Sequence, residues 1–111
     1  MPRFEEKSFV DAVQGFKITN TLVVPPILMA LSRAPKPKLR SLRNIFVGGS
    51  HASDGMQQQL YSQLTPEAKV IQVYGMTEVG WATCWSKVGR DGSGSIGQPL
   101  PGTQLRFVVS L

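Results

Sequence analysis

Short apolar runs that end at glycine or proline alternate with helical patterns along most of this 111-residue chain. The runs at 18–24, 44–47 and 70–73 are rich in β-branched residues and predict strands. Apolar residues recur at helical spacing at Phe9, Val13 and Phe16 and again at Met56, Leu60 and Leu64. The segment 27–32, between the first two runs, is apolar on most sides and predicts a further, buried helix. Strands that alternate with helices imply a parallel sheet with crossover connections. The sequence therefore predicts an α/β class and a partial layered fold with parallel strands and crossover helices.

Capping and breaking residues set the expected ends of the helices. Pro26 suits the first turn of the second helix, and Ser53 is a candidate N-cap for the third, which Pro66 ends. On that third helix we expect the three glutamines at 57–59 to face mainly outward. The remainder, from Trp81 onward, is glycine-rich and includes a predicted strand over 103–109. This part predicts a β-rich C-terminal tail.

Composition narrows the class of protein. Hydrophobic residues make up 41% and charged residues 17% of the chain, which indicates a globular domain. The net charge is +5, but the basic residues between 33 and 43 fall in a connector without aromatic residues among them. This argues for a solvated loop and against a nucleic-acid-binding surface. No apolar run is long enough to span a membrane, residues 1–7 contain no apolar signal region, and Cys84 is the only cysteine. We therefore expect no nucleic-acid partner, no membrane span and a cytoplasmic location.

Two predicted strand exits carry side chains suited to ligand binding. Gly48-Gly49-Ser50 follows the second strand, and the stretch Tyr74 to Glu78 follows the third as a predicted loop. In α/β sheets ligands bind beyond the carboxyl ends of the strands. A tyrosine ring can stack on a base, a threonine hydroxyl can bind a phosphate oxygen, and a glutamate can hold a hard cation. If the two strands are neighbours, both exits open on one edge and form a nucleotide site; the alternative is two ordinary turns.

The order and spacing of several motifs resemble the adenylate-forming enzymes, the AMP-dependent synthetases and ligases. The likeness is greatest to the 4-coumarate–CoA ligase and acyl-CoA synthetase branch. It covers nearly the whole chain and rests on these pieces, in family order: Met1-Pro-Arg-Phe4, Val23-Val-Pro-Pro-Ile27, Ser41-Leu-Arg43, Gly48-Gly-Ser50, Gln72 with Tyr74-Gly-Met-Thr-Glu78, Gly94-Ser-Ile-Gly97 and Pro99-Leu-Pro-Gly102. The resemblance implies an internal part of the large N-terminal domain of such an enzyme.

The same resemblance implies a two-step reaction. A carboxylate attacks the α-phosphate of ATP to give an acyl-adenylate and pyrophosphate, and a thiol, usually of coenzyme A, then displaces AMP. The implied cofactors are therefore ATP or AMP, Mg²⁺ and coenzyme A, and the implied partner is a carboxylic acid substrate.

Family positions assign roles to residues of this chain. Tyr74 would stack on adenine, Thr77 would contact the α-phosphate, and Glu78 would bind Mg²⁺, so Thr77 and Glu78 are the expected catalytic residues. The expected cofactor-binding residues are Gly48, Gly49, Ser50, Gln72, Tyr74, Gly75, Met76 and Thr77. The acyl site falls at Gln72, Val73, Gly75 and Met76, with Val24 and Ile27 as further candidates.

Several departures from the family pattern change what we expect of the acyl pocket and of the activity of this chain. Val73 stands where the family keeps glycine or alanine, which predicts a narrower acyl pocket, and His51 replaces a common proline. The family's phosphate loop, ribose-binding segment and C-terminal domain have no counterpart in residues 1–111, so we expect a fragment of the AMP-binding domain that is inactive alone. The alternative is a non-catalytic nucleotide- or partner-binding remnant. Family members also occur in peroxisomes, but no such signal is readable here.

Overall fold

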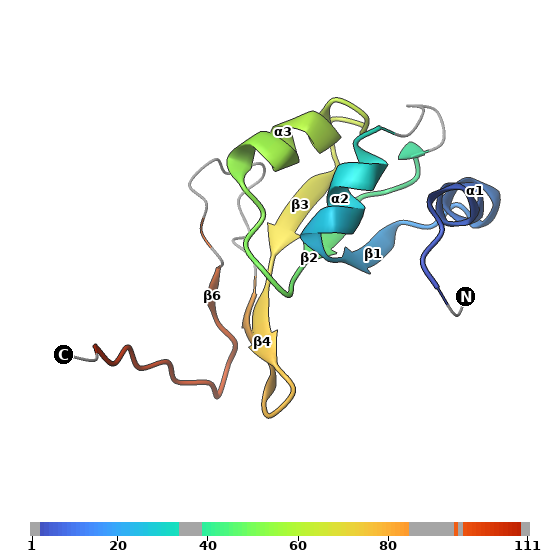
Figure 1. The fold of residues 1–111 in the computed structure, drawn as a ribbon. Coiled ribbons are helices and arrows are strands. Elements are labelled where there is room, and N and C mark those ends of the chain that lie inside the picture. Colours follow the sequence, from blue (N-terminus) through green and yellow to red (C-terminus); the bar gives the residue numbers. More distant parts are fainter. Residues whose placement is uncertain (1–2, 34–38, 85–94, 96, 110–111) are drawn as a thin grey trace.

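The structure is a computed structural model, and it describes residues 3–33, 39–84, 95 and 97–109. Its helices and strands alternate and then give way to strands alone (Figure 1). In chain order they are α1 (Glu6–Phe16), β1 (Asn20–Val23), α2 (Pro25–Leu31), β2 (Asn44–Val47), α3 (Asp54–Tyr61), β3 (Lys69–Gln72), β4 (Tyr74–Met76), β5 (Gly80–Cys84) and β6 (Gln98–Pro99). The mixed α/β prediction is confirmed.

The first three strands form one parallel sheet in the order β1-β2-β3. Each strand aligns with its neighbour without a shift, so that Val23, Val47 and Gln72 share one row. The predicted strand boundaries are correct to within about two residues. Figure 1 shows α2 and α3 on the same face of this sheet. Because all three strands run in one direction, their carboxyl ends lie at one edge.

The hydrophobic core lies between this sheet and the helices. Its fully buried leucines come from α2, α3 and the turn before β2, and they pack against Ile45 and Val47 of the central strand. The Tyr61 hydroxyl accepts a hydrogen bond of 2.9 Å from the Val70 amide, which fixes the end of α3 to β3. The predicted N-cap is confirmed, because the Ser53 hydroxyl accepts from the Met56 amide at 3.3 Å. Helix α3 ends at Tyr61, earlier than the proline predicted to stop it.

A second, antiparallel sheet in the order β4-β5-β6 begins just after β3. The prediction of a loop over Tyr74 to Glu78 is therefore wrong: Tyr74–Met76 is a strand, and a turn at 77–79 joins it to β5. The pairing is possible because Gly75 has no side chain. A Cβ there would meet the Gly80 carbonyl oxygen in a forbidden contact and the Trp81 Cα at 3.0 Å. Gly80 closes the turn with a φ of 70°.

Two other predictions are wrong. Gln57 does not face outward, because its side chain is 6% exposed and its Nε2 donates to the Ala52 carbonyl at 3.1 Å. Residues 103–109 form no strand, and Figure 1 shows this segment running away from the two sheets. Its Phe107, Val108 and Val109 have strand-forming side chains, but none of them pairs with another described strand and all three are more than 80% exposed.

Other features bear on the expected surface properties. Two of the connector lysines, at 36 and 38, lie outside the described residues. Before β3, the pKa of Glu67 is lowered, first by a hydrogen bond from its own backbone and then by one from the Thr65 side chain. The charge of Arg43 acts in the same direction.

No helix among the described residues has the length and apolar composition needed to cross a membrane.

Candidate ligand-binding site at the carboxyl edge of the parallel sheet

The two strand exits singled out in the sequence lie side by side. The Gly48 amide donates to the Val23 carbonyl at 3.1 Å, and the Val73 amide donates to the Val47 carbonyl at 2.9 Å. Hydrogen bonding thus continues one row past the ends of the strands and places Val24, Gly48 and Val73 next to one another. The adjacency that the sequence analysis required for a shared site is present.

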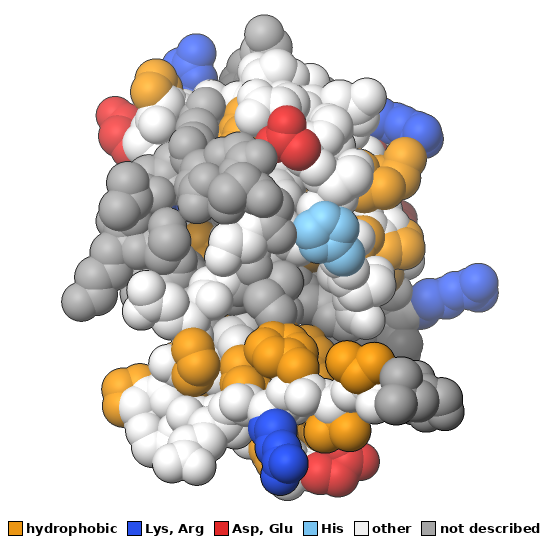
Figure 2. Space-filling view, turned by 90° about the vertical axis from the view of Figure 1, so that its left-hand side faces the viewer, with side chains coloured by type: hydrophobic (Ala, Val, Ile, Leu, Met, Phe, Trp, Pro, Cys, Tyr) orange, Lys and Arg blue, Asp and Glu red, His pale blue; other side chains and the backbone are white. Residues whose placement is uncertain are grey.

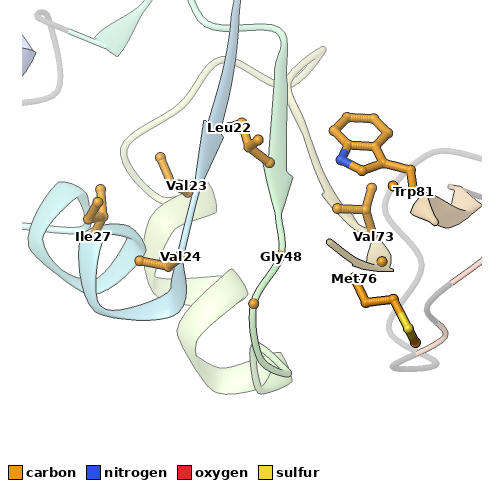
Figure 3. A pocket seen from close by; sticks show the side chains of 11 residues that line it. Leu22, Val23, Val24, Ile27, Gly48, Val73, Met76 and Trp81 are labelled. Carbon is orange, nitrogen blue, oxygen red and sulfur yellow. The ribbon is translucent and has the colours of Figure 1, made fainter. Parts of the chain in front are cut away.

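An apolar cavity of about 450 Å³ opens at this edge. Figure 3 shows Val24 and Ile27 on its α2 side and Val73, Met76 and Trp81 on its hairpin side. Its described lining is Leu22, Val23, Val24, Ile27, Gly48, Gly49, Val73, Gly75, Met76, Gly80 and Trp81. These side chains offer hydrocarbon, a thioether and one indole, and no ionisable group.

A second cavity of about 310 Å³ adjoins the first, and we call it the polar cavity because its lining includes polar side chains beside apolar surface. It is lined by Gly49, Ser50, His51, Gln72, Val73, Tyr74 and Gly75. Tyr74 is 42% exposed, which leaves part of its side chain accessible to a planar group that could stack on it. Figure 2 shows the chain's single histidine exposed on the surface. This cavity has hydroxyl, amide, imidazole and phenol groups within one small volume.

Three residues, Gly49, Val73 and Gly75, line both cavities and so form the wall between them. Gly49 has a φ of 88°, and a Cβ there would approach the Val24 Cγ1 to 3.2 Å. A Cβ on Gly48 would approach the Val73 Cγ2 to the same 3.2 Å. The two glycines therefore let valines from neighbouring strands close around the backbone.

Two buried glutamines hold the loop that follows β2. The Gln72 Oε1 accepts from the Ala52 amide at 3.2 Å, and the Gln57 Nε2 donates to the Ala52 carbonyl at 3.1 Å. Both side chains are less than 10% exposed, so neither bond is exchanged readily for one to water. The loop carrying Gly48 to His51 is thereby attached to both α3 and β3. Sequence reasoning missed Gln57; a glutamine four residues into a helix after a glycine-rich loop was the available signal.

Residues of β5 fix the hairpin beside the cavities. The fully buried Thr83 accepts a hydrogen bond from the Tyr74 amide at 3.2 Å, at an irregularity in the β4–β5 register. Trp81 packs at a tilt against Phe46 of β2, with ring centroids 5.5 Å apart and an interplanar angle of 39°. This contact joins the hairpin to the open face of the parallel sheet. Neither Thr83 nor Trp81 was predicted, because their roles depend on a strand pairing that the sequence did not reveal.

Thr77 and Glu78 lie apart from the other predicted site residues. Both are exposed in the turn between β4 and β5, and neither lines the two cavities. Among the described residues no group of three acidic, histidine or cysteine side chains could hold a metal ion. A single carboxylate suits Mg²⁺ only together with phosphate oxygens and water. Glu78 therefore fits a magnesium ion that arrives with a nucleotide.

The remaining predicted residues divide between the two cavities. The polar cavity brings together Ser50, Gln72 and Tyr74, whereas Gly48 and Met76 line the apolar one. Gln72 lines only the polar cavity, although its position had also placed it among the acyl-site candidates. Val24 and Ile27 both line the apolar cavity.

Comparisons with known proteins identify the family to which the chain belongs. A model of the family described as AMP-binding enzyme matches residues 1–109, and the chain belongs to that family. Its relatives include the acyl-CoA ligase clz12 of Cochliobolus lunatus, 37% identical over 96% of this chain, and the phenylacetyl-CoA ligase epaB of Aspergillus niger, 36% identical over 96%. The chain spans 33% of the length of the first relative and 21% of the second.

Solved structures support the fold. The ATP-bound crystal structure of MatB from Rhodopseudomonas palustris superposes with a TM-score of 0.76 and covers 92% of this chain and 20% of MatB. The sequences are 22% identical, so this likeness bears on the fold alone.

Proposed function

We propose that this chain forms the acid- and nucleotide-binding part of an ATP-dependent carboxylic acid–CoA ligase. The observation that carries the proposal is the pair of adjoining cavities, one lined by apolar side chains and one that also has polar side chains, at the carboxyl edge of the parallel sheet in an AMP-binding family member. The reaction joins a nucleotide to an acid, so both must be held in contact. Two cavities with a common wall can do this.

The chain's residues would act on the first step. The Tyr74 ring stacks on adenine, with the Gly49 and Ser50 backbone on the other side of the polar cavity. The acid lies in the apolar cavity with its carboxylate at the shared wall, near Gly49 and Gly75. Its oxygen attacks the α-phosphorus, the bond to the bridging oxygen breaks, and pyrophosphate leaves with the electron pair. A thiol of coenzyme A later displaces AMP.

Thr77 and Glu78 would meet the phosphates from the hairpin turn. A Thr77 hydroxyl can donate to an α-phosphate oxygen, and the Glu78 carboxylate can share a Mg²⁺ ion with phosphate. The ion, when bound, offsets negative charge on the phosphates during transfer. Since both residues lie outside the cavities described above, the nucleotide must extend past Tyr74 toward the turn.

We further propose that these residues form only part of the catalytic domain. The chain spans 33% or less of the two ligases reported above, and the family's phosphate loop, ribose-binding segment and C-terminal domain would come from elsewhere in the polypeptide. The activity therefore belongs to the assembled enzyme.

The test is a graft. Residues 1–109 replace the matching segment of clz12, and ATP–pyrophosphate exchange is measured with a panel of carboxylic acids. We expect acid-dependent exchange that falls in Tyr74→Ala by a factor equivalent to about 1–3 kcal/mol, the range for base–aromatic stacking. Tyr74→Phe keeps the ring and is the matched control.

A graft that folds and binds AMP but catalyses no exchange with any acid would favour the non-catalytic alternative. Unchanged nucleotide affinity in Tyr74→Ala would remove this residue from the proposed site.

A further inference from the structure

His51, the chain's single histidine, has no role in the function proposed above, although it lines the polar cavity. The residue is exposed, so its ring lies at the opening of the cavity and is accessible to a ligand (Figure 2). It is not in the described lining of the apolar cavity. The polar cavity thus has two aromatic side chains from different elements, His51 from the loop after β2 and Tyr74 from β4.

The backbone beside His51 is held in place. The amide of the next residue, Ala52, donates to the Gln72 Oε1 at 3.2 Å, and its carbonyl accepts from the Gln57 Nε2 at 3.1 Å. Ser53 then follows as the N-cap of α3. Because these bonds fix the segment that carries the ring, a ligand that contacts His51 loses little free energy in ordering the loop.

Gln72 supplies a hydrogen-bond donor at the inner end of the same cavity. Its side chain is only 7% exposed, and the Ala52 amide, itself a donor, must face the side-chain oxygen. This arrangement leaves the Nε2 hydrogens for another acceptor, and no described residue accepts them. A nearly buried donor without an acceptor is costly, so a ligand with a ring nitrogen at this position would gain a favourable bond.

We propose that His51 is a second stacking residue of the nucleotide site: the base lies between the Tyr74 and His51 rings, with a ring nitrogen toward the Gln72 Nε2. This inference rests on the proposed function, because it completes the site which that function assigns to the nucleotide. The reacting phosphorus must meet the acid at the shared wall, and His51 lies outside that wall. The base, and not the phosphates, is therefore the part of the nucleotide that His51 contacts.

The size and lining of the polar cavity suit a planar heterocycle. Its 310 Å³ equals about ten water molecules at about 30 Å³ each, which is enough for a purine and part of a ribose. A purine has apolar faces and a polar edge, and the cavity has apolar surface beside its polar side chains. Histidine rings stack on bases as tyrosine rings do. A hydrogen bond from the exposed imidazole would only replace one to water, whereas stacking buries ring surface.

The single histidine gives the site its own spectroscopic probe. The 111-residue chain is titrated with AMP, adenosine and ribose 5-phosphate at one pH, and the Cε1 proton of His51 is followed by NMR. A base stacked on the ring should shift this signal upfield with AMP and with adenosine. Ribose 5-phosphate, which has no base, should leave the signal in place.

Variants separate stacking from hydrogen bonding. His51→Phe keeps an aromatic ring without nitrogen, and His51→Gln keeps a polar group without a ring. We expect His51→Phe to bind AMP within about twofold of the unmodified chain, and His51→Gln and His51→Ala to weaken AMP about fivefold or more, from the lower end of the range for base–aromatic stacking. Phenylacetate, an acid titrated beside AMP, should bind equally to all of these variants. Gln58→Ala, at an exposed position of α3, is the matched control and should change neither affinity.

Three results would each overturn the inference: AMP binding by His51→Phe as weak as by His51→Ala, a shift caused by ribose 5-phosphate but not by adenosine, or no AMP binding by the chain. Failure of the proposed function gives a different pattern, in which AMP binds with the expected shift but the clz12 graft supports no acid-dependent exchange. Exchange that depends on Tyr74 and not on His51 would leave the proposed function standing without the inference.

Discussion

The two cavities at the carboxyl edge share a wall but differ in chemistry. The apolar one is bounded by β1, α2 and the hairpin, and hydrocarbon surrounds it; the polar one is bounded by the loop after β2 and by Tyr74. Among the described residues, Gly49, Val73 and Gly75 belong to both. A parallel sheet brings these different loops together because its strands end at one edge, so a single fold can place a nucleotide and an acid in contact.

The largest expected loss of stability and of ligand binding comes from a substitution at Gly75, in the shared wall. An alanine Cβ there would collide with the Gly80 carbonyl and crowd the Trp81 Cα, both backbone atoms that cannot rotate away. Gly75→Ala should therefore separate β4 from β5, cost about 1–3 kcal/mol of stability, and impair the binding of both AMP and an acid such as phenylacetate. Chemical denaturation measures the stability, and titrations with AMP and with phenylacetate measure the two affinities.

Gly15→Ala is the matched control, since a Cβ on Gly15 meets nothing within 4 Å and lies in α1. It should keep both affinities and add up to about 1 kcal/mol of helix stability. Normal binding of both ligands by Gly75→Ala would mean that the hairpin does not form the wall.

Much of the site's framework could be predicted from sequence, and the exceptions share a cause. The three parallel strands follow from local β-branched runs, and Gly48 and Gly49 mark a strand exit by themselves. The β4–β5 pairing, the burial of Thr83 and the packing of Trp81 depend on which distant backbone comes alongside, which local pattern does not encode. Gln57 looked exposed because its partner, the Ala52 carbonyl, is invisible in the sequence.

A substitution at Gln57 should have a smaller effect on ligand binding and should affect AMP more than the acid. Gln57→Leu removes the donor to the buried Ala52 carbonyl, a loss of about 1–3 kcal/mol, and loosens the loop that lines the polar cavity. AMP binding should weaken more than phenylacetate binding. Gln58→Leu, at the neighbouring exposed position, should leave both affinities intact.

If Gln57→Leu weakens the binding of AMP and of phenylacetate equally, the glutamine stabilises the fold in general and not the polar cavity in particular.

The smallest effect on binding is expected from Val73→Gly, which removes a side chain from the shared wall and widens the space beside it. Removing the side chain should shift preference toward acids that are bulky next to the carboxylate, by about 1 kcal/mol or more for each methylene accommodated. Affinities for phenylacetate and its α-substituted analogues measure this shift, and AMP serves as the internal reference. A profile that does not move would place the Val73 side chain outside the acid's path.

Which cavity binds AMP and which binds the acid can be observed directly with both ligands bound. Intermolecular nuclear Overhauser effects are recorded between the chain's aromatic protons and a mixture of AMP and phenylacetate. We predict that the adenine protons contact Tyr74 and not Trp81, and that the phenyl protons contact Trp81 and not Tyr74. Adenine contacts to Trp81, or phenyl contacts to Tyr74, would contradict the account.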